Sequence, residues 1–218
     1  MRIARAVFCL LISACALIAL NMKMGDVPPL GKFLDPFGGF WANAESRNTD
    51  PAEELQLGEL RDEVTIRYDR SRIPHIFAKN DHDLYFAQGF VTARDRLWQM
   101  DFQTRFASGR LSEVVGAKAL ELDRYQRRMG MLYGAEKMVA EMDKDPVIKE
   151  VIDAYTAGIN AYIRTLDPKD YPIEFKILNY SPEEWKPLYC ALLLKLMSAT
   201  LTGGSDEMYM SNALSRFG

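Results

Sequence analysis

The chain has 218 residues, a formal net charge of -3, and ordinary fractions of hydrophobic (48%) and charged (26%) residues. This length suits one domain or part of a larger one, and the composition is that of a folded protein. The small net charge, without a basic stripe interleaved with aromatics, argues against nucleic-acid binding. No Cys-x-x-Cys pair occurs, so neither a zinc site nor a redox motif is indicated.

Residues 1–24 have the layout of an export leader. Arg2 and Arg5 precede an uncharged apolar run from Ala6 to Leu20, as in a secretory signal peptide or a short signal anchor. The run is short for a comfortable membrane span. Cys15 stands in a sequence like a lipoprotein cleavage box, although the apolar run continues past it. The sequence therefore predicts a protein that is periplasmic or membrane-anchored facing the periplasm, and it leaves cleavage, anchoring and lipidation open.

Residues 25–60 are rich in proline, glycine and aromatic residues. The aromatic residues are Phe33, Phe37, Phe40 and Trp41. A disordered linker is normally poor in aromatics, so we expect this segment to dock on the folded body or on a membrane surface. Asn43 to Glu54 lacks that pattern and is predicted to be the linker proper, which leaves residues 61–218 as the main region.

Two short strands are predicted next. Val64–Tyr68 alternates in polarity as a strand does, Pro74 ends the turn, and His75–Ala78 is the second strand. Two strands alone are marginally stable in water. The hairpin therefore needs a larger sheet, which this chain does not contain.

A long helix is predicted from Asn80 to about Ser108, before a glycine that stops it. Asn80 is a good N-cap, and Asp83 stands in capping-box register. Charges such as Asp95 and Arg96 alternate with large apolar groups more densely than an amphipathic or a solvated helix requires. We therefore expect these charges to be paired in the interior, with an architectural rather than a catalytic role.

Further helices are predicted along the rest of the chain. They are Leu111–Val115, Leu122–Met142, a helix that begins at Asp145-Pro146, a turn of helix that begins at Ser181–Glu184, and Leu188–Leu201. The helix that begins at Asp145-Pro146 has apolar residues on one face as far as Tyr162. The last helix is apolar nearly all round, so it needs cover from elsewhere. The sequence thus predicts a mostly helical piece of a bigger fold.

A series of motifs runs in unbroken order from about residue 64 to residue 210. It consists of Ile73-Pro74-His75-Ile76, Asp83, Phe86, Gly89-Phe90, Ala93, Asp95-Arg96-Leu97, Gln99-Met100-Asp101, Gly109 to Gly116, Asp123, Arg127-Arg128, Pro172 to Phe175, Ser181 to Pro187, and Gly204 to Glu207. Together the motifs resemble the α-subunit of the penicillin acylases, which are N-terminal-nucleophile amidohydrolases. The resemblance implies an α+β fold: this chain would be the mostly helical α-chain portion of an αββα sandwich and would contribute a short two-stranded element.

The resemblance also implies a function. The chain would be the α-subunit part of an exported amidohydrolase that cleaves a linear amide between an acyl group and an amine. In this family autoproteolysis of a precursor frees an N-terminal serine on a β-subunit, and its own amine acts as the base that helps form an acyl-enzyme. No residue of this chain is then expected to be catalytic, and the β-subunit is the expected partner.

The resemblance further suggests where this chain would touch the chemistry. Counting back from Glu207 puts Met197, Thr200 and Leu201 at the acyl-binding pocket. Penicillin G acylases carry an arginine–phenylalanine pair where this chain has Thr200 and Leu201, so an aliphatic or small polar acyl group is favoured at least as much as phenylacetyl. Glu207 matches a glutamate that helps bind a structural calcium ion together with β-subunit carboxylates, and no organic cofactor is expected.

Other interpretations stay open at this point. An N-acyl homoserine lactone acylase of the same family would place a long aliphatic chain against Leu201. A helical envelope domain that binds partners without catalysis would need the same framework. Met197, Thr200 and Leu201 also fit an ordinary core stripe, and Glu207 also fits an exposed acid after a helix end.

Overall fold

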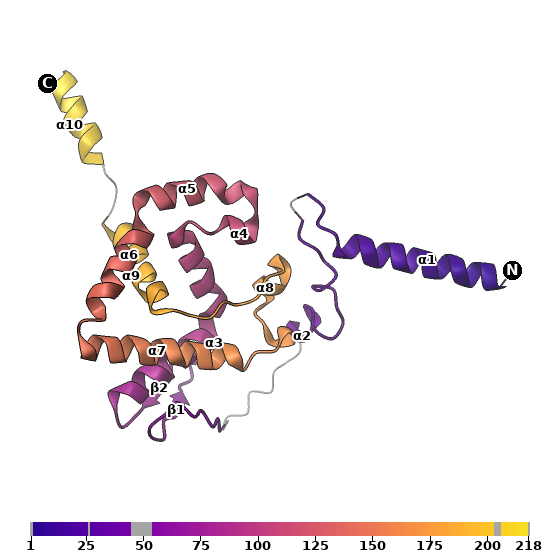
Figure 1. The fold of residues 1–218 in the computed structure, drawn as a ribbon, viewed down its shortest axis with the longest axis horizontal. Helices are drawn as coiled ribbons and strands as arrows, with labels where there is room; N and C mark the ends of the chain where they lie inside the picture. The colour runs from indigo at the N-terminus through magenta and orange to yellow at the C-terminus, as the bar shows by residue number, and fades with distance from the viewer. Residues whose placement is uncertain (1, 26, 45–53, 203–205, 218) are drawn as a thin grey trace.

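The computed structural model describes residues 2–25, 27–44, 54–202 and 206–217, and the observations below concern these residues. The elements in chain order are α1 (Arg2–Asn21), α2 (Trp41–Ala44), β1 (Thr65–Tyr68), β2 (Pro74–Phe77), α3 (Asp81–Ser108), α4 (Ser112–Val115), η1 (Ala117–Ala119), α5 (Leu120–Met129), α6 (Met131–Met142), α7 (Pro146–Arg164), η2 (Pro168–Asp170), α8 (Ile173–Leu178), α9 (Pro187–Leu201) and α10 (Asp206–Phe217). Figure 1 shows a helical body, from which α1 and α10 project on two different sides.

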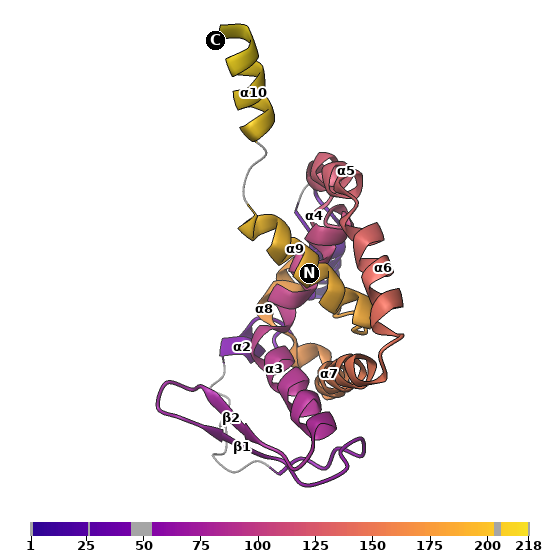
Figure 2. The same cartoon turned by 90° about the vertical axis from the view of Figure 1, so that its left-hand side faces the viewer.

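The predicted hairpin forms as a two-stranded antiparallel sheet. Its register runs from Thr65 opposite Phe77 to Tyr68 opposite Pro74. The Asp69 carboxylate fixes the turn by accepting the backbone N–H of Ile73 at 2.9 Å. In the view of Figure 2 the hairpin lies at one end of the body, beside the start of α3.

The long helix α3 begins and ends as predicted. The Asn80 side chain accepts the backbone N–H of Asp83 at 2.9 Å, and the backbone of Gly109 turns left-handed (φ 67°) to end the helix. Arg96 has non-helical backbone angles (φ -142°, ψ 21°), so α3 is kinked there. The half before the kink packs against α7, and the half after it leads towards α5.

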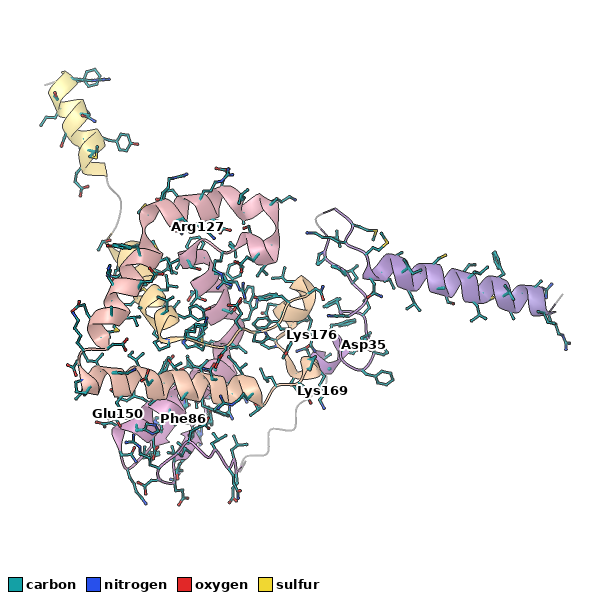
Figure 3. All side chains as sticks on the ribbon, in the orientation of Figure 1. Asp35, Phe86, Arg127, Glu150, Lys169 and Lys176 are labelled. Atoms are coloured by element: carbon teal, nitrogen blue, oxygen red, sulfur yellow. The ribbon has the colours of Figure 1, made fainter. Side chains whose placement is uncertain are left out.

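The core lies between α3 and α7, with α9 packed on both α3 and α6. Phe86, Ile159, Phe175 and Leu192 are fully buried, and Figure 3 shows Phe86 at the crossing of α3 with α7. The two helices approach closely because each has a glycine that lies against the backbone of the other helix, Gly89 on α3 and Gly158 on α7. A Cβ at Gly158 would lie 1.9 Å from the Phe86 carbonyl oxygen, and one at Gly89 would lie 2.1 Å from a carbonyl of α7.

Two predictions about the helices are wrong. The expected helix Leu122–Met142 is two helices, because Gly130 adopts a left-handed conformation (φ 72°) between α5 and α6. The turn of helix expected at Ser181–Glu184 does not form: these residues are irregular, and Glu183 is held by distant arginines. The short helix α8, which no sequence pattern indicated, precedes them and buries Phe175.

The expected burial of Asp95 and Arg96 is also wrong. Both side chains are exposed, and Arg96 donates to Gln99 on the same helix. The buried charges of α3 are Asp83 in its first turn and Asp101 and Arg105 after the kink. Ala93, Leu97 and Met100 are the residues that this part of α3 buries, and the two charged side chains face solvent instead.

The segment between α1 and β1 contacts the body. Asn43 donates its side-chain N–H to the Tyr171 carbonyl at 3.0 Å, and Leu57 and Leu60 pack against the core. Most of the predicted linker Asn43–Glu54, namely residues 45–53, lies outside the described residues.

Helix α1 is the one helix, within the described parts of the chain, that is long and apolar enough to cross a membrane. Its mean hydropathy is 2.5 and none of it is buried against the body. A signal sequence at the N-terminus has the same features.

Candidate functional site

Helix α9 carries the predicted acyl-pocket residues, and the body covers its first half. Pro187 opens the helix, where its missing N–H costs nothing. Tyr189, Ala191 and Leu192 are buried against α3 and α6. Leu196 still packs against the core, whereas residues 197–201 are all exposed.

The exposed end of α9 has an apolar face. Leu194, Met197 and Leu201 follow one another at helical spacing and therefore lie on one side of the helix, with Met197 56% and Leu201 76% exposed. Thr200 lies on an adjacent side, and its hydroxyl donates to the Leu196 carbonyl at 2.9 Å. The structure thus brings Met197 and Leu201 together, while the hydroxyl proton of Thr200 is engaged by the backbone.

Glu207 lies on α10, and its side chain is exposed. The rest of α10 is rich in exposed apolar residues, which are Met208, Tyr209, Met210, Leu214 and Phe217. In the described part of the chain no three histidine, cysteine or acidic side chains are grouped to hold a metal. Calcium prefers six to eight oxygen ligands. This chain by itself therefore does not fit a calcium site, and Glu207 could supply at most part of one.

A cluster of charged side chains lies where α3, α4 and the segment before α9 meet. Its members are Asp101, Arg105, Arg110, Glu113, Tyr180, Glu183 and Tyr189, and we call it the Arg105 cluster. Arg105 is 5% exposed and donates from Nε to Asp101 at 2.9 Å. Its two terminal nitrogens donate to Glu113 at 2.8 Å and to Glu183 at 2.6 Å.

The charges of the Arg105 cluster shift one another's pKa values. Burial opposes ionisation of Glu183, but hydrogen bonds and charges from Arg110 and Arg105 outweigh it and lower its pKa to about 2. Burial raises the pKa of Asp101, and the hydrogen bonds from Arg105 and from the Tyr180 hydroxyl, which donates at 2.9 Å, act against that rise. Every charge thus has a partner, so the cluster is architectural.

A second buried carboxylate fixes the loop between α3 and α4. Asp123 accepts the backbone N–H groups of Leu111 at 2.8 Å and Ser112 at 2.7 Å. Burial opposes ionisation, but these hydrogen bonds outweigh it and lower the pKa of Asp123. Arg127, labelled in Figure 3, donates to the Gly109 carbonyl at 2.9 Å, so α5 holds both ends of the loop.

The two histidines and the cysteine of the body are engaged structurally. His82 Nδ1 lies 2.9 Å from the buried carboxylate of Asp83, and His75 lies 3.6 Å from Asp69 on the exposed hairpin. Burial raises the pKa of the Cys190 thiol, which keeps it protonated. None of these groups is prepared as a nucleophile or base.

Sequence reasoning missed the Arg105 cluster. The i,i+4 spacing of Asp101 and Arg105 was a signal for an ion pair. Glu183, however, is 78 residues from Arg105, and no sequence pattern joins the two.

Known proteins of similar sequence match most of this chain. A family model described as penicillin amidase matches residues 63–218. The penicillin acylase 2 proenzyme of Pseudomonas sp. (strain SE83) is 37% identical over 144 residues, which are 65% of this chain and 18% of that protein. The acyl-homoserine lactone acylase QuiP of Pseudomonas syringae pv. tomato is 36% identical over 186 residues, which are 85% of this chain and 22% of that protein.

A solved structure shows the same fold. The thermostable penicillin G acylase from Alcaligenes faecalis superimposes with a TM-score of 0.61 at 21% identity, over 70% of this chain and 82% of the matched chain. The chain spans about a fifth of the length of the two curated relatives. Since the family model covers the whole folded body, the chain belongs to the penicillin amidase family.

Proposed function

We propose that this chain is the α-part of an exported amidohydrolase that cleaves a linear amide between an acyl group and an amine. The family match over residues 63–218 carries the proposal. The nucleophile would be the N-terminal serine of a β-subunit, which attacks the amide carbonyl, releases the amine and leaves an acyl-enzyme for water to hydrolyse. The residues of this chain would shape the site and take no part in proton transfer.

Two observations support a β-subunit from the same precursor. One relative is named a proenzyme, and the chain spans 18% of it. The same chain covers 82% of the matched chain of the solved acylase. A long precursor and a short matched chain are what processing into subunits would produce.

The exposed face of α9 supports a position for the acyl group. Met197 and Leu201 lie open beyond the body, and a β-subunit packed there would enclose them in an apolar pocket. Met197 would line the pocket, Leu201 would contact the end of the acyl chain, and the Thr200 oxygen could still accept a hydrogen bond. These side chains favour an aliphatic acyl group.

A second candidate is hydrolysis of N-acyl homoserine lactones. The relative that covers 85% of this chain is named an acyl-homoserine lactone acylase, and the aliphatic α9 face suits a long acyl chain. A non-catalytic envelope domain is the third reading, and the experiment below separates the three.

Calcium is proposed as a structural ion shared with the β-subunit. Glu207 is an exposed carboxylate in the first turn of α10, and it would supply one ligand. If so, a chelator lowers the melting temperature of the mature enzyme, and Glu207→Gln removes most of that effect.

The test is to express the full-length precursor and measure its mass and its activity. We expect processing into two chains and hydrolysis of acyl amides, with rates that differ along a series of short, medium and long acyl groups. The same acyl groups on homoserine lactone decide the second candidate. The control replaces the β-subunit N-terminal serine by alanine. Absence of hydrolysis by a correctly folded protein would refute the enzyme proposal, and equal rates across the series would refute the pocket.

A further inference from the structure

The residues between α1 and the body form a folded unit rather than a loose linker. We call residues 22–25 and 27–44 the juxtamembrane segment. Asp35 builds its central turn by accepting the backbone N–H groups of Phe37 at 3.2 Å and Gly38 at 3.1 Å. Phe40 stacks on Phe33, with ring centroids 5.0 Å apart.

The juxtamembrane segment is fixed to the end of α1. The backbone N–H of Gly31 donates to the Leu20 carbonyl at 2.9 Å, so the chain folds back on the last turn of α1. Met24 and Val27 pair as an antiparallel bridge between these two points. The segment therefore begins at the level where α1 ends.

The same segment is fixed to the body. The Lys176 side chain is buried at 7% exposure and donates to the Gly39 carbonyl at 2.9 Å and the Lys169 carbonyl at 2.8 Å. Figure 3 shows Asp35 beside Lys176 and Lys169. Gly39 is itself buried, and it has no room for a side chain, since a Cβ there would lie 2.2 Å from the Phe33 carbonyl oxygen. A buried ammonium that binds backbone carbonyls makes this a defined joint.

The outer surface of the segment is apolar and exposed. The side chains are Met22 at 59%, Met24 at 57%, Val27 at 46%, Leu34 at 43%, Phe37 at 86% and Trp41 at 55% exposure. Lys23 and Lys32 are exposed cations of the same segment. Aromatic and aliphatic groups with a nearby lysine, directly after an apolar helix of 20 residues, are the composition of a membrane–water interface.

We infer that α1 stays in the bilayer and that the juxtamembrane segment lies in the lipid interface, which holds the helical body against the membrane surface. The occupant of the apolar surface is the lipid itself, because the segment is joined to the one helix, of those described, that can span a membrane. Leu34, Phe37 and Trp41 enter the boundary between headgroups and acyl chains, and Lys32 meets the phosphates. Figure 1 shows the segment between α1 and the body, which is the position that contact with the lipid headgroups requires.

Site-specific photocrosslinking tests this inference. The full-length protein is made with a benzoylphenylalanine in place of Phe37 and reconstituted in vesicles of phosphatidylethanolamine and phosphatidylglycerol, with an alkyne-tagged phosphatidylethanolamine as the lipid probe. Phe37 is almost fully exposed, so the analogue is tolerated. Matched variants carry the same analogue at Val147, which is exposed on α7, and at Phe40, which stacks inside the segment.

We expect a lipid adduct from the analogue at Phe37 and none above background from those at Val147 and Phe40. Equal labelling at Phe37 and Val147 would overturn the inference. An adduct of Phe37 with protein, whether the β-subunit or a second copy, would also overturn it. A mature chain that begins after Asn21 would overturn it as well. Hydrolase activity, measured on the detergent-solubilised protein, reports separately on the proposed function.

Discussion

Arg105 is a buried cation with three carboxylate partners. It neutralises Asp101, Glu113 and Glu183, which come from three different parts of the chain. Removing one partner of a buried ion pair leaves an uncompensated charge and costs about 3–5 kcal/mol. Arg105→Ala should therefore lower the free energy of unfolding by that order, measured by urea denaturation of the full-length protein.

Arg124→Ala is the control for Arg105→Ala. Arg124 pairs with Glu121 on the surface, where both side chains are more than half exposed. Exposed pairs contribute at most about 1 kcal/mol. Equal losses in the two variants would contradict the architectural role of Arg105.

Asp83 makes stability depend on acid pH. It is fully buried, and burial opposes its ionisation. Hydrogen bonds from Arg61, His82, Asn80 and Asp62 outweigh that and lower its pKa below the ordinary value of 3.8. When the pKa of a carboxyl is lower in the native than in the unfolded state, its ionised form stabilises the fold. This stabilisation is fully present above about pH 3.8, the pKa of the unfolded state, and is lost progressively as the pH falls towards the pKa of the native state.

Asp83→Asn should therefore be less stable than wild type at neutral pH, and the difference should shrink as the pH falls below about 4. Urea midpoints between neutral and acid pH measure this. Asp81→Asn changes an exposed carboxylate of the same helical turn and should show little difference at any pH. A constant gap between wild type and Asp83→Asn at all pH values would refute the assignment.

At the scale of elements, the crossing of α3 with α7 depends on two glycines. A Cβ at Gly158 would overlap the Phe86 carbonyl, which cannot move without shifting α3. Gly158→Ala should lower the melting temperature, because over-packing of this kind costs about 1–3 kcal/mol. Gly134→Ala in α6 is the control: its Cβ would lie 3.6 Å from a flexible lysine, and alanine is the better helix former by about 1 kcal/mol. A Gly158→Ala variant as stable as Gly134→Ala would show that the helices can separate freely.

Most elements follow from local signals, and the exceptions have tertiary causes. Asn80, Gly109 and Pro187 place the ends of α3 and the start of α9 within a residue or two, because each acts on its own backbone. The break at Gly130 was missed, since a helix interior tolerates glycine unless the packing requires a turn. The conformation of Ser181–Glu184 depends on Arg105 and Arg110, which are far away in the sequence.

The candidate site was only partly predictable. Helical spacing brought Met197 and Leu201 to one face, as expected from the sequence. Which side of α9 stays open depends on where α3 and α6 pack, and that appears in the tertiary structure alone. Glu207 is not grouped with two further metal-binding side chains in the described part of the chain, so its calcium role stays a prediction that depends on the β-subunit.

At the scale of the molecule, the open end of α9 should select the acyl group. Leu201→Ala removes most of an exposed side chain from the proposed pocket and leaves the core untouched. We expect kcat/KM for long acyl amides to fall by about 10-fold, which corresponds to the loss of about two buried methylene contacts, with little change for short ones. Leu122→Ala, on the surface of α5, should change neither. A uniform loss for all acyl lengths in Leu201→Ala would place Leu201 outside the pocket.

The sequence by itself determined the family, the hairpin and the two ends of α3, because motifs, strand alternation and caps act locally along the chain. The export leader stays a prediction. The tertiary structure decided which charges are buried, which face of α9 is open, and how residues 22–44 join α1 to the body. Those features depend on contacts between residues far apart in the sequence, such as Arg105 with Glu183 and Lys176 with Gly39. Such contacts arise from the packing of whole helices, and no local pattern encodes them.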